Sequence, residues 1–516
     1  MSEATPNRVF ITLSIMLATI MQALDTTIAN VALPHMQGSL NATQEQVSWV
    51  LTSYIVAAAI MTAPSGFLAD KLGRRRVFIV SIIGFTLSSV ACGLAQNLDE
   101  MILFRVLQGV FGAALVPLSQ AVLLDINPPE KHGQAMAVWG VGVMLGPILG
   151  PTLGGYLTEY FNWRWVFFIN VPVGIASLAG FILFMPETDK AAARRFDWFG
   201  FILLSVFVGA LQMMLDRGET LDWFSSMEIV IELVVAVLAF YLFIVHTLTA
   251  DKPFLAPAMF ADRNYVVSLV FMFVFGIIIL ASMALLPPFL QSLKGYPVIL
   301  SGLVMAPRGM GTMAAMLVVG RLVGKVDARI LIFFGFALIA YSLHDMSLFT
   351  LDVPAKYIVY TGVVQGFGMG FVFVPLSTIA YRTLPAHFRN DAAAVFSLSR
   401  NIGSSLGISI VMAMLAQFTQ INHADITASM LPFGNAGRLL SEFTQMSTGT
   451  GADQMLAMLN AEVTRQAAVI GYLNDFRLMM YLVIASAPLL LLVRMTPVGK
   501  APGKAPPEEF EPMVMD

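Results

Sequence analysis

The chain has 516 residues, of which 57% are hydrophobic and 12% are charged, and its net charge is -3 at pH 7. An ordinary soluble domain carries roughly 25% charged residues, so this composition is that of an integral membrane protein. The sequence offers no basic patch for nucleic acid, and one cysteine with six scattered histidines indicates neither a disulfide nor a metal site. Because no Walker A loop, nucleophile elbow or HExxH segment is present, we predict a protein that is not an enzyme and needs no cofactor.

Apolar segments of about 20 residues, the length that crosses a bilayer core of ~30 Å, recur along the chain. The first is expected to be retained, since it lacks a small-x-small cleavage site. The seventh is short and the eighth carries Glu228 and Glu232, which makes these two the weakest. The fourteen predicted spans are 9-32, 46-69, 77-96, 100-124, 134-157, 164-184, 198-215, 227-248, 265-290, 301-321, 329-349, 355-380, 391-417 and 475-495.

Lysine and arginine gather in alternate loops, as they do in the cytoplasmic loops of membrane proteins. One side collects 19 of them and the other 7, while Arg105, Arg308 and Arg400 fall inside predicted spans. Both termini are therefore predicted to be cytoplasmic, as an even number of spans requires. Residues 496–516 are Pro-rich and are predicted to form a disordered tail.

Two predicted cytoplasmic loops are similar to each other. The segments "GFLADKLGRR" at 66–75 and "GRLVGKVDAR" at 320–329 share Gly, Leu, Lys and Arg at matching positions. They follow the second and tenth spans. Parallel repeats with a central insertion would give this arrangement, and transporters are often built from such repeats.

A long polar stretch, 418–474, lies on the predicted outer side. Apolar residues recur at mixed three and four spacings around 439–443 and 455–469, which predicts two short amphipathic helices. They would either lie on the membrane surface or dock a partner outside the cytoplasm, and both interpretations stay open.

Two charges inside predicted spans stand at similar depths. Asp25 lies ~25 Å along a helix from Arg8 and ~13 Å from Pro34, and Arg105 lies ~9 Å inside the fourth span. A buried aspartate costs a few kcal/mol and should face a cavity or a partner. We therefore predict Asp25 and Arg105 as a proton-coupling pair. Other roles stay open: Asp25 could bond to neighbouring helix dipoles, and Arg105 could bind an anion directly or snorkel to the membrane interface.

Polar residues accompany this pair on the same two helices, and other spans carry isolated charges. The first group is expected to line a substrate cavity and consists of Gln22, Thr26, Asn30 and Gln108. Arg308 and Arg400 are buried charges for which the sequence assigns no partner, and Glu232 and Asp345 could either supply further carboxylates for transport or lie near the outer boundary of their spans.

The fifth predicted span, "GVMLGPILGPTLGG", carries a glycine at every fourth residue. These glycines would share one helix face and allow close packing against another helix. Pro147 and Pro151 on the neighbouring stripe remove two backbone donors, so we expect the helix to bend or unwind. A rigid packing seam and a hinge between bundles are both open. The four glycines are Gly142, Gly146, Gly150 and Gly154.

Several segments, in order, resemble the signature motifs of the major facilitator superfamily. They are "LDTTIANVALP", "GFLADKLGRRR", "RVLQGVFGAA", "GVMLGPILGPTLGG" and "WRWVFFINVPVG". The resemblance is to the fourteen-span drug:proton antiporter branch (DHA2), and is closest to multidrug exporters of the EmrB type. It is densest over residues 20–175 and continues through "LDRGETLDWFSS" and "APRGMG".

This resemblance implies an all-α membrane fold of 14 transmembrane helices. It places a six-helix bundle in 1–190, two inserted helices in 191–255 and a second bundle, including the loop 418–474, in 256–495. It also implies alternating access with protons as the coupling ion and export of amphipathic toxic compounds across the bacterial inner membrane. A periplasmic adaptor of the EmrA kind and an outer-membrane channel would be partners. An importer or facilitator of a defined metabolite on the same fold is the alternative.

The resemblance also implies roles for particular residues. Asp25 and Arg105 would be the acid and the arginine of proton coupling. Because Gly324 stands in the second loop copy where the first has Asp70, a symmetric gate is not expected. The antiporter motif would comprise Gly142, Gly146, Pro147, Gly150, Gly154 and Gly155, and the gating loop Gly66, Asp70, Gly73, Arg74 and Arg75.

Overall fold

The computed structural model describes residues 8–187, 196–429 and 450–494. Within these ranges the regular structure is helical, apart from a bridge between Val323 and Val326. Thirteen of the described helices are long and apolar enough to cross a membrane, or fourteen if a helix pair bent by 55° counts as one span. The bent pair is α2 (Gln44–Thr62) with α3 (Ser65–Leu72). The fourteen predicted spans are confirmed on this count.

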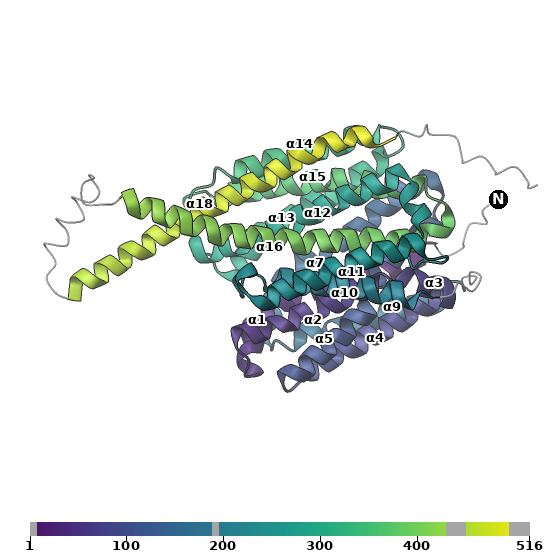
Figure 1. Ribbon diagram of the computed structural model, residues 1–516, viewed down its shortest axis with the longest axis horizontal. Helices are drawn as coiled ribbons and strands as arrows, with labels where there is room; N and C mark the ends of the chain where they lie inside the picture. The colour runs from purple at the N-terminus through teal and green to yellow at the C-terminus, as the bar shows by residue number, and fades with distance from the viewer. Residues whose placement is uncertain (1–7, 188–195, 430–449, 495–516) are drawn as a thin grey trace, which may run out of the picture.

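The helices form two bundles with two extra helices between them (Figure 1). The first bundle contains α1 (Arg8–Ser39), α2, α3, α4 (Arg74–Leu94), α5 (Leu98–Gly112), α6 (Leu115–Ile126), α7 (His132–Tyr160), α8 (Trp165–Phe168) and α9 (Asn170–Phe184). The extra helices are α10 (Trp198–Arg217) and α11 (Met227–Thr249). The second bundle contains α12 (Arg263–Pro288), α13 (Val298–Leu322), α14 (Ala328–Met346), α15 (Ala355–Arg382), α16 (Arg389–Ser429) and α18 (Thr450–Ser486). The domain boundaries at 190 and 255 stay predictions, and the tail 496–516 lies outside the described residues.

Helices α16 and α18 project beyond the rest of the molecule, at the end opposite α3 (Figure 1). We call the end with α3 the loop end and the opposite end the arm end. With 41 and 37 residues, the two helices are about 62 and 56 Å long, about twice the thickness of a bilayer core. The prediction of two short separate helices in 418–474 is wrong for its described part, because residues up to Ser429 continue α16 and residues from Thr450 begin α18. The stretch 439–443 lies outside the described residues.

The two projecting helices pack together as a hairpin, and we call their parts beyond the bundle the arms. His423 in α16 contacts Asn460 in α18, with 3.0 Å between Nε2 and Oδ1. Closer to the bundle the two helices approach so tightly that a Cβ atom added to Gly471 would lie only 3.1 Å from Leu415 Cδ1. The apolar residues at mixed spacings of three and four therefore mark one face of a long helix, and they do not show where a helix begins or ends.

The two similar loops occupy matching places in the two bundles. A Cβ on Gly66 would lie 2.5 Å from Asp391 Oδ1 at the start of α16, and one on Gly320 would lie 2.6 Å from Ala137 Cβ near the start of α7. Each loop glycine thus packs against a helix of the opposite bundle. The matching packing supports the duplication that the sequence suggested.

The loop arginines also match. Arg75 Nη2 donates to the carbonyl of Ile182 near the end of α9, at 2.7 Å. Arg329 Nη2 likewise donates to the carbonyl of Val493, just after the last helical turn of the described chain. Each arginine therefore ties the start of the third helix of its bundle to the end of the sixth.

Candidate functional site

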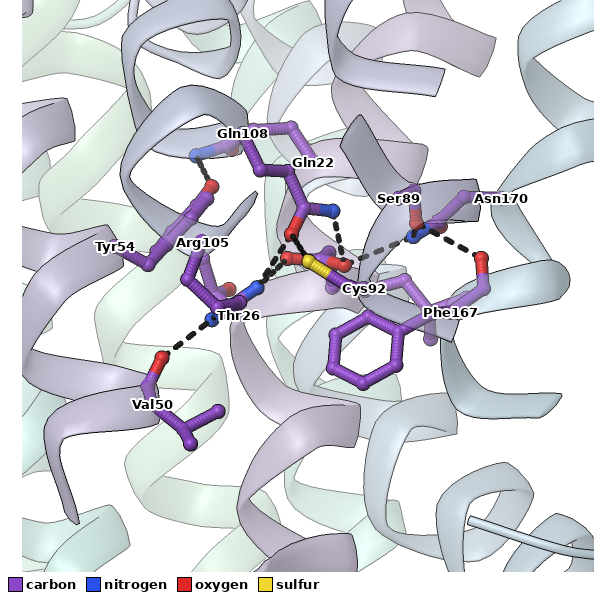
Figure 2. A network of polar contacts seen from close by, with 12 residues as sticks. Gln22, Thr26, Val50, Tyr54, Ser89, Cys92, Arg105, Gln108, Phe167 and Asn170 are labelled. Carbon is purple, nitrogen blue, oxygen red and sulfur yellow. Dashed lines mark hydrogen bonds and ion pairs between the residues drawn. The ribbon is translucent and has the colours of Figure 1, made fainter. Parts of the chain in front are cut away.

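Asp25 and Arg105 form a buried ion pair in the first bundle (Figure 2). Arg105 Nη1 lies 2.7 Å from Asp25 Oδ2, and both side chains are 0% exposed. Gln108 completes a triangle, because its Nε2 donates to Asp25 Oδ1 and its Oε1 accepts from Arg105 Nη1, both at 2.8 Å. The pair predicted from helix depth is thus in direct contact. Snorkelling of Arg105 to the interface is excluded by its complete burial.

Helix α2 fixes the guanidinium from a second side. Arg105 Nε donates to the carbonyl of Val50 at 2.8 Å, and its Cζ lies 4.2 Å from the centre of the Tyr54 ring. This close approach depends on Gly109, because a Cβ there would lie 2.5 Å from the Tyr54 carbonyl oxygen. Cation–π contact and a charge-assisted hydrogen bond both favour one orientation of the arginine.

Asn170, the first residue of α9, links Asp25 to helices α9 and α4. Its Nδ2 donates to Asp25 Oδ1 at 2.8 Å and contacts Ser89 Oγ at 3.0 Å. Ser89 in turn donates to the carbonyl of Phe167 at 2.8 Å. The carboxylate therefore connects α1 with α5 and α9 directly, and with α2, α4 and α8 through its partners (Figure 2).

Of the four residues expected to line a cavity, only Gln108 belongs to the buried network. Gln22 donates to the Tyr54 hydroxyl at 3.2 Å and so touches its edge. Thr26 donates to the Ala23 carbonyl of its own helix, and Asn30 is exposed. Their substrate role stays a prediction. Sequence reasoning missed Tyr54, Ser89 and Asn170, since none breaks the apolar pattern of its span as a charge does.

The glycines predicted in α7 pack against α1. A Cβ on Gly146 would lie 2.4 Å from the backbone carbon of Ala23, and one on Gly150 would lie 2.1 Å from Thr27 Oγ1. Gly142 and Gly154 likewise face α1, whereas Gly155 has no atom within 4 Å of an added Cβ. Gly155 therefore takes no part in this seam.

Helix α7 is uninterrupted from His132 to Tyr160, so of the two effects expected from Pro147 and Pro151 the unwinding is wrong, while a bend stays a prediction. A proline removes a backbone donor but leaves the helix intact where neighbouring helices hold it in place. The other side of α7 packs on the second bundle, where a Cβ on Gly140 would lie 2.5 Å from Met316 Sδ of α13. Helix α7 thus lies between α1 and α13.

The first loop copy, which was predicted to act as a gate, contacts the second bundle at the loop end. Asn390, at the start of α16, donates from Nδ2 to Asp70, and its Oδ1 accepts from Arg74 Nε at 3.1 Å. Gly73 has a φ of 88°, a turn conformation that favours glycine. In the second copy the turn glycine is Gly324, with φ 92°, which carries no carboxylate. The expected asymmetry between the two copies is present.

Asp125, at the end of α6, is a second contact at this end that the sequence analysis missed. It pairs with Arg74 of the first bundle and, at 2.5 Å from Oδ1 to Nη1, with Arg389 of the second. One carboxylate therefore bridges both bundles. Its neighbours in the sequence show only the end of an apolar run, so no local signal marks this role.

The remaining charges have separate surroundings. Glu232 lies 3.4 Å from Arg217 and so helps to join α10 with α11. Asp345 is buried near the end of α14 beside Tyr341 and Tyr357. Arg308 is buried in α13, and Arg400 lies half-buried in α16. Within the described residues, no group of three or more His, Cys, Asp or Glu could hold a metal ion.

Comparison with known proteins agrees with this architecture. Residues 15–408 match the sequence profile of the Major Facilitator Superfamily. The chain belongs to this superfamily. It is 37% identical over 471 residues to the multidrug export protein EmrB of Escherichia coli, covering 90% of each chain. It is also 33% identical to the fatty acid resistance protein FarB of Neisseria gonorrhoeae, covering 94% of this chain and 96% of FarB.

Solved structures of the superfamily share the fold. The proton:xylose symporter XylE superposes with a TM-score of 0.59 at 13% identity, covering 93% of this chain and 95% of XylE. The human organic anion transporter MFSD10 gives 0.58 at 14% identity, covering 93% of this chain and all of that chain. The superfamily and its EmrB-like relatives identify the chain as a multi-pass membrane transporter and not an enzyme.

Proposed function

We propose that this transporter is a proton-coupled antiporter that exports amphipathic toxic compounds across the bacterial inner membrane. The buried Asp25–Arg105 pair carries the proposal, because a carboxylate inside the membrane is a group that can accept and release a proton. Export as the direction is supported by relatives named for multidrug export and fatty acid resistance. The Lys and Arg distribution supports cytoplasmic termini, with the loop end facing the cytoplasm.

Protonation of Asp25 would change several helix contacts at once. It removes the charge that Arg105 balances, and it weakens the hydrogen bonds that Arg105, Gln108 and Asn170 donate, because a neutral carboxyl is a poorer acceptor than a carboxylate. Since α1 packs on the glycines of α7, and α7 packs on α13, a shift of α1 has a direct mechanical route to the second bundle. Such a route is what alternating access driven by a proton requires.

The gate contacts support the same cycle. Asp70, Arg74 and Asp125 hold the loop end against α16. Movement of the bundles would have to break these contacts to admit a substrate from the cytoplasm. Partly exposed ion pairs are weak, each worth about 0.2–1 kcal/mol, so they suit a contact that must open and reclose.

The arms support an extracytoplasmic partner, such as a periplasmic adaptor of the EmrA kind that joins an outer-membrane channel. Ile421 lies about 32 residues after the start of α16, ~48 Å along the helix and beyond the span of a bilayer core. Ile421, Leu456 and Met458 are exposed apolar side chains on these arms. Large apolar side chains exposed on helices that extend beyond the bilayer are candidates for a surface that a partner covers.

The decisive experiment compares Asp25→Asn with wild type in everted membrane vesicles. Wild type should release protons from the vesicle interior when a toxic amphipath is added, and should concentrate that compound inside. Asp25→Asn should insert normally but lose both activities, while Asp251→Asn, which removes an exposed carboxylate, should keep them. Gradient-driven movement in the opposite direction would identify an importer. Proton movement unaffected by Asp25→Asn would refute this coupling site.

A further inference from the structure

The second bundle contains a counterpart of the buried polar network. The segment VLQG in α5 ends at Gly109, and VVQG in α15 ends at Gly366. A Cβ on Gly109 would lie 2.5 Å from the carbonyl oxygen of Tyr54, and one on Gly366 would lie 2.0 Å from that of Arg308. Helix α13 therefore packs on α15 as α2 packs on α5. Arg308 occupies the backbone place in α13 that Tyr54 occupies in α2.

The second bundle has no arginine at the position in α15 that corresponds to Arg105 in α5. Gln108 corresponds to Gln365, and three residues earlier α5 carries Arg105 where α15 carries Gly362. A Cβ on Gly362 would lie 3.5 Å from Arg308 Cβ, so Arg308 lies over the position that the missing side chain would occupy.

The aspartate is missing as well. A Cβ on Gly403 of α16 would contact the backbone of Phe273, as one on Gly146 of α7 would contact that of Ala23. Asp25 stands two residues after Ala23 in α1, and Phe275 stands two residues after Phe273 in α12. Phe275 therefore occupies the place of the aspartate. The second bundle thus keeps the glutamine, replaces both charged partners, and adds a guanidinium on the neighbouring helix.

This guanidinium is buried, and none of the ion pairs found among the described residues includes it. Arg308 is 7% exposed, and its Nη2 donates to Ser282 Oγ at 2.7 Å and lies 3.6 Å from Met369 Sδ. Its Nη1 has no hydrogen-bond partner within the described part of the chain, and neither does either polar atom of Gln365, which is 0% exposed. A buried cation of this kind is costly unless an anion compensates it.

We propose that Arg308 binds the carboxylate of an amphipathic substrate, with the Gln365 amide as a second donor. This rests on the proposed export function and names one substrate class for it: monocarboxylates with an apolar chain. A guanidinium presents parallel N–H groups that match a carboxylate. Arg308 contacts α12 at Ser282. Ser282 lies about seven residues, or ~10 Å, closer to the arm end than Phe275, the position that corresponds to Asp25. The contact is therefore on the side of α12 away from the loop end. The Met369 thioether beside it suits the apolar chain better than a hydrated inorganic ion.

The test uses two ligands with the same chain and opposite charge, dodecanoate and dodecyltrimethylammonium. Their binding is measured by calorimetry to the full-length protein in lipid nanodiscs, without a proton gradient. Arg308→Gln should weaken dodecanoate binding about tenfold or more, the effect of losing a charge-assisted hydrogen bond, and leave the cation's affinity unchanged. Arg308→Lys should retain part of the affinity. Arg263→Gln, which removes an exposed arginine at the start of α12, is the matched control.

Three results would overturn the inference. The first is equal weakening of both ligands by Arg308→Gln, which would mean that Arg308 has a structural role. The second is unchanged dodecanoate binding in Arg308→Gln. The third is binding of chloride, and not of dodecanoate, that depends on Arg308. The proposed export function is judged separately. A wild-type protein that binds dodecanoate through Arg308 but exports nothing would refute export only, and one that exports the cation but never binds dodecanoate would refute this inference only.

Discussion

The carboxylate of Asp25 accepts hydrogen bonds from three side chains that lie 80, 83 and 145 residues away in the sequence. One of them, Arg105, could be predicted as a partner, because a charge inside an apolar span must find a partner at its own depth, whereas Gln108 was predicted only as a residue that lines a cavity. Asn170 could not be predicted, since an asparagine at the start of an apolar run reads equally well as a helix end. Only the packing of α9 against α1 and α4 brings it to the carboxylate.

The glycines of the predicted antiporter motif differ in whether a side chain added there would collide with a neighbouring helix. Gly146→Ala puts a methyl group 2.4 Å from the Ala23 backbone, which cannot move aside as a flexible side chain can. We expect this variant to lose most export and to melt several degrees lower than wild type.

Gly155→Ala is the matched control at the end of the same motif. Its added methyl group meets nothing within 4 Å, so neither export nor the melting temperature should change. Export assays in vesicles and thermal unfolding of the purified protein measure both variants. Equal damage from the two substitutions would contradict a seam between α1 and α7.

At the scale of single helices, the spacing of apolar residues predicted where the helices cross the membrane, but it did not predict that α16 and α18 continue beyond it. The arms were predicted as separate pieces because their spacing weakens outside the membrane, where no lipid or core enforces an apolar face. In the structure, α16 and α18 simply continue, and the contact between His423 and Asn460 keeps them side by side. A helix can thus extend well beyond the residue at which its apolar pattern fades.

Shortening the arms tests their role without disturbing the bundle. Replacing 424–459 with a short Gly-Ser linker removes the far part of both arms but keeps His423 next to Asn460. We expect normal insertion, unchanged drug binding and unchanged proton-coupled transport in vesicles, with resistance of whole cells lost if an adaptor docks on the arms. Resistance of growing cells and drug transport in vesicles are the two measurements. Full resistance in cells would refute docking there.

Across the whole molecule, the duplicated loops could be read from the sequence, but their partners could not. The shared Gly and Arg positions predicted matching places, and Gly66 with Gly320 and Arg75 with Arg329 occupy them. The bridge through Asp125 depends on two arginines from opposite halves of the chain meeting at one carboxylate. No local pattern encodes such a meeting, because it exists only when both bundles close.

Asp125→Asn therefore tests whether the loop end is held shut by charge. The change removes two partly exposed ion pairs at the junction of the bundles, worth about 1 kcal/mol together, and so should raise the open population about fivefold. Amide hydrogen exchange at 66–75 and 389–395 should quicken accordingly, and high salt should reproduce the effect in wild type because it screens exposed pairs. Glu228→Gln is the matched control, since it removes an ion pair with Arg217 between α10 and α11 and leaves the bundle contacts intact. Equal exchange in Asp125→Asn, Glu228→Gln and wild type would mean that packing of Gly66 against α16, and not the ion pairs, keeps the loop end closed.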